Sequence, residues 1–452
     1  MSGMVDVVIV GAGPAGIAAA LEASAQGLSV TLIDEQPAPG GQIWRGVEQA
    51  QGAGTLGQDY VAGADRARAL RASGIDYRPA TTLWHLDEAG VASVLSSGHS
   101  DQIEARRVIL ATGAMERPVP IPGWTLPGVM TAGAAQILLK TAAAVPQGPV
   151  VLAGQGPLLW LIAQQLVAAG APPTLILETR RASPVATALG HLSGLWRGRE
   201  WVAKGLTMMR AVQSAGVRVV TGASGLRAEG KDRLERVTWS GGAQHAATLL
   251  LHEGVIPNVQ VSLALGLAHE WDTAQLCWRP RLDAFGATSE TRIAIAGDGA
   301  GIGGWQAAEA RGRLAALDAA HRLGRLDAAQ CDALAAPWQA ELGRALAIRP
   351  FLDALYRPAK EVLLPPDAET IVCRCEEVSA RRVREAARLG ATGPNQAKAY
   401  LRCGMGPCQG RLCGPTVAAL IADERGVPVQ TVGTYRPRAP YKPITVAELA
   451  DG

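Results

Sequence analysis

The stretch Val8-Ile9-Val10-Gly11-Ala12-Gly13-Pro14-Ala15-Gly16 decides the fold of the N-terminal part of the chain. Its apolar residues predict a buried parallel strand, and the Ala/Leu-rich segment that follows predicts a helix to Ala25. Gly11 allows a tight turn, Gly13 lets the backbone approach a pyrophosphate, and Gly16 lets the helix pack on the strand. The pattern therefore predicts a dinucleotide bound at the helix N-terminus, over Gly11, Gly13, Pro14, Ala15 and Gly16.

Acidic residues follow at the distance that this kind of site requires. The next predicted strand runs from Leu28 to Ile33 and is followed by Asp34 and Glu35. A carboxylate at the end of this second strand binds ribose hydroxyls in dinucleotide-binding units. A chance glycine-rich turn, the alternative explanation, would not require such an acid.

Three further segments are candidates for the same site. The Pro/Gly-rich loop 37–45, with Gly41 and Gln42, would line a flavin ring or form an ordinary surface turn. The predicted strand 108–111 delivers Ala111, Thr112 and Gly113 to the carboxyl edge of the sheet, where ligands bind. The predicted strand 292–298 ends in Gly297 and Asp298, which would bind a ribityl chain or cap the helix 305–319.

Residues 149–178 repeat the opening pattern of strand, glycine turn, helix, strand and acid. Leu159 stands where the third glycine or alanine belongs, and its larger side chain would push the helix from the strand. Glu178 suits an unphosphorylated ribose, whereas the following Arg180 and Arg181 would meet a 2′-phosphate. This second site therefore takes NAD(P), another adenine nucleotide or nothing.

Composition excludes several classes of protein. The chain has 452 residues, 48% hydrophobic and 18% charged, so it is a globular protein with room for two or three domains. Its net charge of +3 gives no reason to expect nucleic acid binding. The uncharged stretch 141–177 is interrupted by prolines and glycines, so we expect no transmembrane segment, and the N-terminus lacks the pattern of a signal peptide.

The cysteines cluster near the C-terminus, which indicates a metal site in a reducing compartment and hence the cytoplasm. Cys373-x-Cys375 and Cys408-x4-Cys413 form two close pairs, as a [2Fe–2S] cluster needs. A predicted amphipathic helix, 379–389, lies between the pairs. Cys403 also stands at x4 spacing from Cys408, and zinc is the alternative metal. Cys277 and Cys331 stand alone and are expected to be buried.

Residues 1–120 and 286–330 resemble the two parts of the FAD domain of glutathione-reductase-like flavoproteins. In those proteins a NAD-type domain is inserted within the FAD domain, and here it would be residues 121–285. The resemblance implies an α/β fold with two dinucleotide-binding domains, a helical connector at 331–368 and a small helical [2Fe–2S] domain at 369–452. That last segment resembles the bacterioferritin-associated-ferredoxin module, whose C-Q-G-x-x-C form matches Cys408-Gln409-Gly410-Arg411-Leu412-Cys413. The match implies Cys373, Cys375, Cys408 and Cys413 as ligands and leaves Cys403 out.

Four stretches resemble the FAD-binding α subunits of heteromeric amine dehydrogenases, such as D-hydroxyproline dehydrogenase, opine oxidases and hydrogen cyanide synthase. They are Pro39–Gln42, Gly393–Lys398, Cys403–Cys408 and the tail Arg438–Thr445. The resemblance implies FAD, a [2Fe–2S] cluster, a β flavoprotein subunit that oxidises a D-amino acid, imino acid or opine, and in some complexes a small ferredoxin-like subunit. A self-contained NAD(P)H-dependent oxidoreductase and a non-catalytic redox sensor are the alternatives. The seven histidines show no triad or metal spacing.

Overall fold

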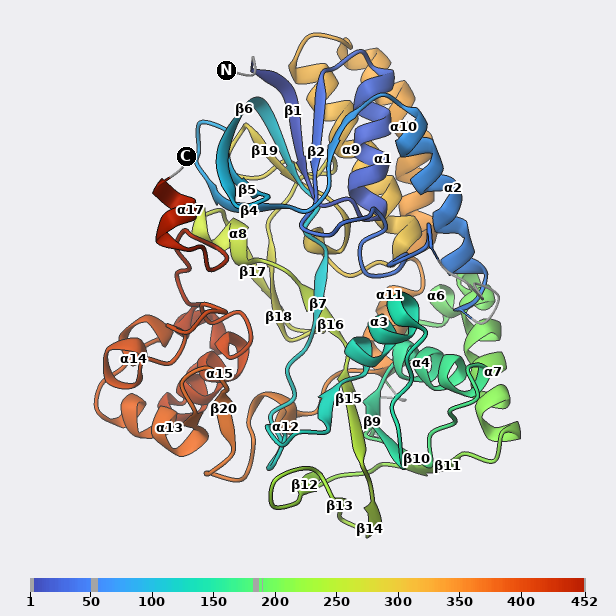
Figure 1. Cartoon of the computed structure of the whole chain (residues 1–452), viewed down its shortest axis with the longest axis vertical. Helices are drawn as coiled ribbons and strands as arrows, with labels where there is room; N and C mark the ends of the chain where they lie inside the picture. Colours follow the sequence, from blue (N-terminus) through green and yellow to red (C-terminus); the bar gives the residue numbers. More distant parts are fainter. Residues whose placement is uncertain (1–3, 50–55, 182–186, 189, 451–452) are drawn as a thin grey trace.

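The computed structural model describes residues 4–49, 56–181, 187–188 and 190–450. Figure 1 shows one lobe around a first sheet at the top, a second lobe around another sheet below it, and a smaller helical lobe on the left. The chain ends at the upper left, where α17 (Val446–Ala450) lies beside the first lobe. Within the described ranges, no helix combines the length and the apolar character needed to cross a bilayer.

The first sheet has seven strands in the order β3-β2-β1-β6-β5-β4, with β19 also paired to β6. They are β1 (Val5–Val10), β2 (Val30–Ile33), β3 (Asp76–Arg78), β4 (Thr81–Leu86), β5 (Val91–Ser96), β6 (His99–Leu110) and β19 (Ile293–Ile295). The first half of β6 pairs antiparallel with β5, and its second half pairs parallel with β1 and β19. The long strand β6 therefore brings Ala111 to the edge at which β1 ends, as the sequence predicts.

Helix α1 (Pro14–Ala25) packs at backbone distance against the turn before it and against α9 (Trp305–Arg322). A Cβ atom on Gly16 would lie 1.7 Å from the carbonyl oxygen of Gly11, and one on Gly312 would lie 2.1 Å from that of Ala15. Real Cβ atoms do not approach so closely, so only glycine permits this packing. The contact fixes the position of the helix N-terminus relative to the end of β1.

The second sheet has five parallel strands in the order β11-β10-β9-β15-β8. They are β8 (Val129–Thr131), β9 (Val150–Gln155), β10 (Leu175–Glu178), β11 (Arg218–Thr221) and β15 (Thr248–Glu253). Alternate residues of its strands pack on opposite faces, as the twofold repeat of a strand requires. One face is covered by α3 (Ala132–Ala142), α4 (Pro157–Ala168) and α7 (Arg199–Ser214), and the other by a small antiparallel sheet, β12 (Arg227–Glu229), β13 (Arg236–Trp239) and β14 (Gly242–His245).

Two short strands join the lobes. The chain leaves the first lobe through β7 (Ala114–Glu116) and returns through β16 (Val255–Pro257), and the two strands pair antiparallel. The return continues through α8 (Gln260–Ala264), β17 (His269–Asp272) and β18 (Cys277–Pro280).

The C-terminal lobe follows a helical connector, α10 (Ala328–Leu346), α11 (Arg349–Leu355) and α12 (Lys360–Leu363). It contains β20 (Ile371–Cys373), β21 (Val378–Ser379), α13 (Ala380–Arg388), α14 (Pro394–Leu401), α15 (Gly414–Arg425) and α16 (Val429–Val432). It contacts the second lobe where Trp124 Nε1 donates to the carbonyl of Ile371 at 2.6 Å, with the Arg374 guanidinium 5.1 Å from the same indole ring. The sequence-based domain boundaries stay predictions.

Replacing Gly16 with alanine tests the helix contact. The added methyl group has no room beside Gly11, so we expect the free energy of unfolding to fall by about 1–3 kcal/mol. The matched control is Gly205→Ala in α7, where an added Cβ meets nothing within 4 Å. Alanine in that open helical position should stabilise by up to about 1 kcal/mol. Urea unfolding of both variants gives the comparison, and equal stabilities would contradict the packing argument.

Candidate functional site

A cavity of about 1420 Å³ extends along the carboxyl edge of the first sheet and into the space between the lobes. Of the residues predicted to contact FAD, only Gly16 does not line this cavity, because it is buried in α1. The others all line it: Gly11, Gly13, Pro14, Ala15, Asp34, Glu35, Gly41, Gln42, Ala111, Thr112, Gly113, Gly297 and Asp298. The fold thus brings together segments that lie nearly 300 residues apart in the sequence.

The glycine loop meets the loop at Gly41 at backbone distance. Gly11 has φ of +103°, and Gly13 and Gly41 approach so closely that a Cβ on Gly41 would lie 2.9 Å from the Cα of Gly13. The space above the N-terminus of α1 is therefore bordered by main-chain atoms, and helix N–H groups that no helical carbonyl can reach point toward it. This is the geometry that a dinucleotide pyrophosphate requires, so the chain fits FAD at this position.

The two acids after β2 have different surroundings. Asp34 is buried, and its carboxylate accepts hydrogen bonds from the backbone N–H groups of Ala12 at 2.5 Å and Gln36 at 2.7 Å. Burial raises the pKa of Asp34, and these two hydrogen bonds oppose the rise. Glu35 is half exposed at the cavity wall and pairs with Lys442 at 2.7 Å. Asp34 is thus fixed by the glycine loop, whereas Glu35 faces the C-terminal tail.

Asp298 holds the loop in front of α9 through backbone hydrogen bonds. Its Oδ1 accepts hydrogen bonds from the N–H groups of Gly303 at 2.9 Å and Gly304 at 3.2 Å, just before α9 begins at Trp305. The same residue lines the cavity. The aspartate therefore shapes the loop in front of α9 at the cavity wall, and its binding to a ribityl chain stays a prediction.

The structure reveals a buried His–Glu pair that sequence analysis missed. His252 Nδ1 lies 2.6 Å from Glu116 Oε1, and Glu116 Oε2 accepts from the N–H of Gly133 at 2.8 Å. Both side chains line the cavity near the crossing strands β7 and β16. The two residues are separated by 136 positions in the sequence, and the pairing of β7 with β16 brings them together. No spacing rule in the sequence could have found them.

A second missed feature is a hydrogen-bonded chain that links the lobes. Lys140 Nζ donates to the carbonyl of Gln42 at 3.0 Å and to Gln136 Oε1 at 3.1 Å. Gln136 donates to Gln165 Oε1 at 2.7 Å, and Gln165 donates to the carbonyl of Leu56 at 3.0 Å. Burial and the neighbouring positive charge of Arg45 lower the pKa of Lys140 to about 7. A neutral amine still has two N–H groups, enough for both acceptors.

The second glycine turn borders the same cavity through Gln155, Gly156, Pro157 and Leu158. The amide of Gln155 donates to Glu253 Oε2 at 2.9 Å and to the carbonyl of Arg357 in the connector at 3.3 Å. Burial raises the pKa of Glu253. Leu159, the residue that departs from the glycine pattern, belongs to α4 and is fully buried in the core between this helix and the second sheet. The connector thus packs against this turn and ties it to the rest of the chain.

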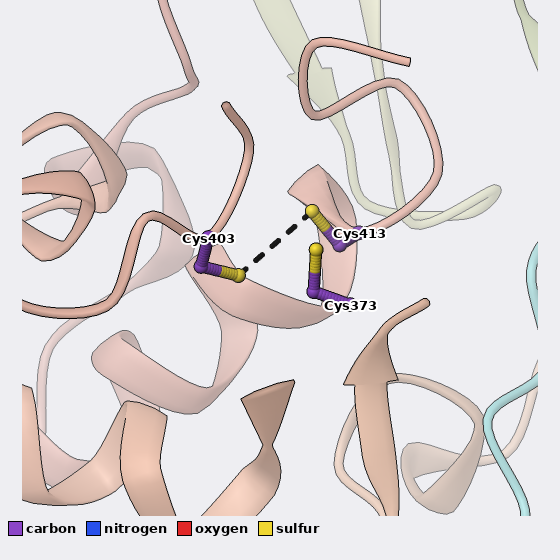
Figure 2. Close-up of side chains that lie close together, drawn as sticks. All are labelled: Cys373, Cys403 and Cys413. Carbon is purple, nitrogen blue, oxygen red and sulfur yellow. Dashed lines mark hydrogen bonds between the residues drawn. The ribbon is translucent and has the colours of Figure 1, made fainter. Parts of the chain in front are cut away.

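The five C-terminal cysteines lie in two adjoining groups. The sulfur atoms of Cys373, Cys403 and Cys413 lie within 4.8 Å of one another, and those of Cys403 and Cys413 are 4.0 Å apart, as Figure 2 shows. The sulfur atoms of Cys375 and Cys408 are 3.8 Å apart. The structure therefore places the four predicted ligands in two groups, with Cys373 and Cys413 beside Cys403 and with Cys375 beside Cys408. Cys277 and Cys331 are buried and lie apart from this group, as expected.

The chemistry of the cysteine group fits an iron–sulfur cluster. Thiol hydrogen bonds from Cys403 and Cys413 lower the pKa of Cys373 to about 2, and the same crowding raises the pKa of Cys413. Thiolates packed this closely repel one another unless a cation lies between them. Beside them, the buried Tyr435 Oη makes no well-aligned hydrogen bond among the described residues and interacts only with the Cys403 sulfur. A phenol hydroxyl without a well-aligned protein acceptor there suits a sulfur of a bound cluster.

Fold and site together define a class of flavoprotein. Residues 5–312 match the pyridine nucleotide-disulphide oxidoreductase family, and residues 371–423 match the BFD-like [2Fe-2S] binding domain. The chain belongs to this oxidoreductase family and carries FAD and a [2Fe–2S] cluster. The predicted glutathione-reductase-like fold with a C-terminal cluster domain is thereby confirmed.

Similarity over the full chain places it within a smaller group of this family. The resemblance to opine oxidase and hydrogen cyanide synthase subunits, inferred from the sequence, is confirmed. The chain is 46% identical to an opine oxidase subunit from Rhizobium meliloti, over 98% of this chain and 87% of that protein. It is 33% identical to hydrogen cyanide synthase subunit HcnB of Pseudomonas aeruginosa, over 97% of this chain and 96% of that protein. Both relatives are named as subunits of larger enzymes.

Solved structures show the same fold. L-proline dehydrogenase from P. horikoshii superposes with a TM-score of 0.75 at 22% identity, over 99% of this chain and 79% of that chain. T. acidophilum thioredoxin reductase superposes with a TM-score of 0.50 at 18% identity, over 71% of this chain and 98% of that chain. The first match extends over the C-terminal lobe as well as both nucleotide-binding lobes.

The buried amine of Lys140 predicts a pH dependence of stability. In the folded protein the amine is neutral above about pH 7, whereas in the unfolded chain it stays protonated to about pH 10. The unfolded state therefore binds the extra proton, so stability rises with pH across this window. Relative to Lys140→Met, the unfolding free energy of the wild type should rise by about 1.4 kcal/mol per pH unit between roughly pH 7 and 9. Urea unfolding at several pH values measures this slope, and parallel curves would contradict it.

Proposed function

We propose that this chain is the electron-transfer subunit of a heteromeric dehydrogenase whose partner flavoprotein oxidises the C–N bond of a D-amino acid, an imino acid or an opine. One observation carries the proposal: a single chain combines a dinucleotide cavity with a cysteine cluster lobe that packs on the cavity wall through Arg411. The full-length similarity to an opine oxidase subunit supports it. D-hydroxyproline is one substrate of this class.

The chain's residues favour electron transfer over disulfide reduction. Disulfide reductases need a cysteine pair near the flavin, and this sequence has no cysteine before Cys277. Cys277 itself is buried, and its burial raises the pKa of the thiol to about 12, so it would react poorly. The bound FAD and cluster supply one- and two-electron chemistry, and the protein supplies their binding, orientation and surroundings.

We assign the predicted cavity residues to FAD. The glycine loop and the N-terminus of α1 would hold the pyrophosphate. Asp34 and Glu35 would bind the ribose of the adenosine. Asp298 would face the ribityl chain. Gly41, Gln42 and the Ala111–Gly113 strand end would border the isoalloxazine. Each assignment rests on the position of the residue along the cavity wall.

We assign the cluster to Cys373, Cys375, Cys408 and Cys413, with Cys403 as a buried neighbour. Cys408→Ser should therefore abolish the electron paramagnetic resonance signal of the reduced cluster, because one thiolate ligand is lost. Cys403→Ser is the matched control and should keep most of the signal and of the bound iron. Since Cys403 lies as close to Cys413 as a ligand would, the reverse result would exchange the roles of Cys403 and Cys408.

A self-contained reductase is the second candidate, because the second glycine turn opens into the same cavity as the flavin site. In that case NADH or NADPH would reduce the flavin of the isolated chain. Leu159 and the engaged amide of Gln155 count against it. Stopped-flow absorbance after mixing with either nucleotide separates the two functions, since fast bleaching of the flavin would favour the reductase.

We also infer the cellular compartment and the partner subunits of this protein. Thiolate ligands persist in reducing compartments, which favours the cytoplasm. The partners are a β flavoprotein subunit that binds the amine and, in some complexes, a small ferredoxin-like subunit.

Co-expression with flavoproteins encoded beside this chain tests the function. Anaerobic addition of D-amino acids or opines to the purified complex should bleach the flavin and produce the signal of the reduced cluster, whereas the isolated chain should stay oxidised. The matched control is the Cys408→Ser complex, in which the amine should still bleach flavin but produce no cluster signal. If no amine or opine reduces the cluster in any complex, the proposed function is wrong.

A further inference from the structure

The position of the C-terminal tail in the fold is set by a buried tyrosine. The N–H of Tyr441 donates to the carbonyl of Trp84 at 2.8 Å. Its hydroxyl accepts from the N–H of Leu86 at 3.3 Å and donates to the Leu86 carbonyl at 3.2 Å. The carbonyl of Tyr441 accepts from Gln260 Nε2 at 3.1 Å. Tyr441 therefore fixes the tail against the end of β4 and the start of α8, both of which belong to the first lobe.

The loop between Cys408 and Cys413 is bound to this tail and to the same glutamine. Gln409 Oε1 accepts from the N–H of Arg438 at 3.1 Å, and Gln409 Nε2 donates to the carbonyl of Pro440. Arg411 Nη1 donates to Gln260 Oε1 at 3.1 Å. Arg411 thus connects the C-Q-G-R-L-C loop directly to the wall of the FAD cavity, and Gln409 connects the loop to the tail.

Tail and loop bring two cations to the acid at the end of β2. Lys442 Nζ lies 2.7 Å from Glu35 Oε2, and Lys442, Tyr441 and Arg411 all line the cavity. Burial acts to raise the pKa of Glu35, but the Lys442 ammonium, a hydrogen bond from Gln36 and the more weakly acting Arg411 guanidinium together outweigh it and hold this pKa below its ordinary value. Glu35 is therefore an ionised carboxylate held in place by Lys442, and it can accept hydrogen bonds from ribose hydroxyls.

We propose that the tail Arg438–Lys442 and the cluster loop form the adenosine end of the FAD site, with Lys442 as the residue that positions Glu35. The cysteine lobe then does more than carry the cluster, since Arg411, Tyr441 and Lys442 line this part of the cavity. FAD affinity consequently depends on an ordered cluster loop, and occupancy of the two cofactor sites is coupled. By linkage, bound FAD favours the ordered loop by the same factor.

Titration of the flavin-free protein with FAD, followed by quenching of flavin fluorescence, tests the proposal without any amine substrate. Lys442→Met should raise the dissociation constant of FAD about fivefold, as expected for a partly exposed charge contact. Tyr441→Phe should raise it about tenfold, because the Leu86 N–H and carbonyl lose their buried partner. Lys442→Arg keeps the charge and should restore most of the affinity, which a merely structural role would not require.

The matched control is Lys360→Met, which removes a lysine 3.7 Å from Asp423 on the surface of the C-terminal lobe, away from the cavity lining. Its dissociation constant should equal that of the wild type. Gln409→Ala detaches the loop from the tail without touching a cysteine or FAD, and it should weaken FAD binding while iron is retained. Should Lys442→Met and Gln409→Ala both bind FAD like Lys360→Met, the adenosine end is formed without the tail and the proposal is overturned. Failure of every amine to reduce a complex would leave this result unaffected.

Discussion

The close contact of α1 with the turn before it and with α9 is the constraint on which the site depends. Gly16 and Gly312 let three stretches of backbone meet with no side chain between them. That contact holds the N-terminus of α1 at the end of β1, where the glycine loop, the acids after β2 and the strand end at Ala111 meet. The cradle for a pyrophosphate is thus a consequence of packing, because the main chain itself forms the wall.

The cluster lobe meets the other lobes through specific polar contacts. Ile371 receives a hydrogen bond from the indole of Trp124, and Arg411 and Tyr441 reach the first lobe through Gln260. The cluster lobe therefore contributes Arg411 to the wall of the flavin cavity and is held to the first lobe by more than a free linker. For an electron-transfer subunit this arrangement fixes the separation of its two cofactors, the quantity that protein structure controls in such a reaction.

The sequence predicts what local patterns encode. The glycine motif, the acid after β2 and the paired cysteines each follow from spacing within one supersecondary unit, and the cavity contains the first two as expected. His252 and Glu116 were missed because their pairing depends on the crossing of β7 and β16. The chain from Lys140 through Gln136 to Gln165 was missed for a similar reason, since the contact between α3 and α4 gives no periodic signal. Spacing also could not show that Cys403 lies as close to Cys413 as a ligand does.

The central claim is that one folded chain holds FAD and a [2Fe–2S] cluster within a common structure. Anaerobic purification of this chain, followed by titration with a limiting one-electron donor, measures it directly. We expect one FAD, two iron ions and two acid-labile sulfides per chain, and electron exchange between the flavin and the cluster at a rate independent of protein concentration. A colourless protein that yields neither flavin nor iron, or exchange that needs collisions between molecules, would contradict it.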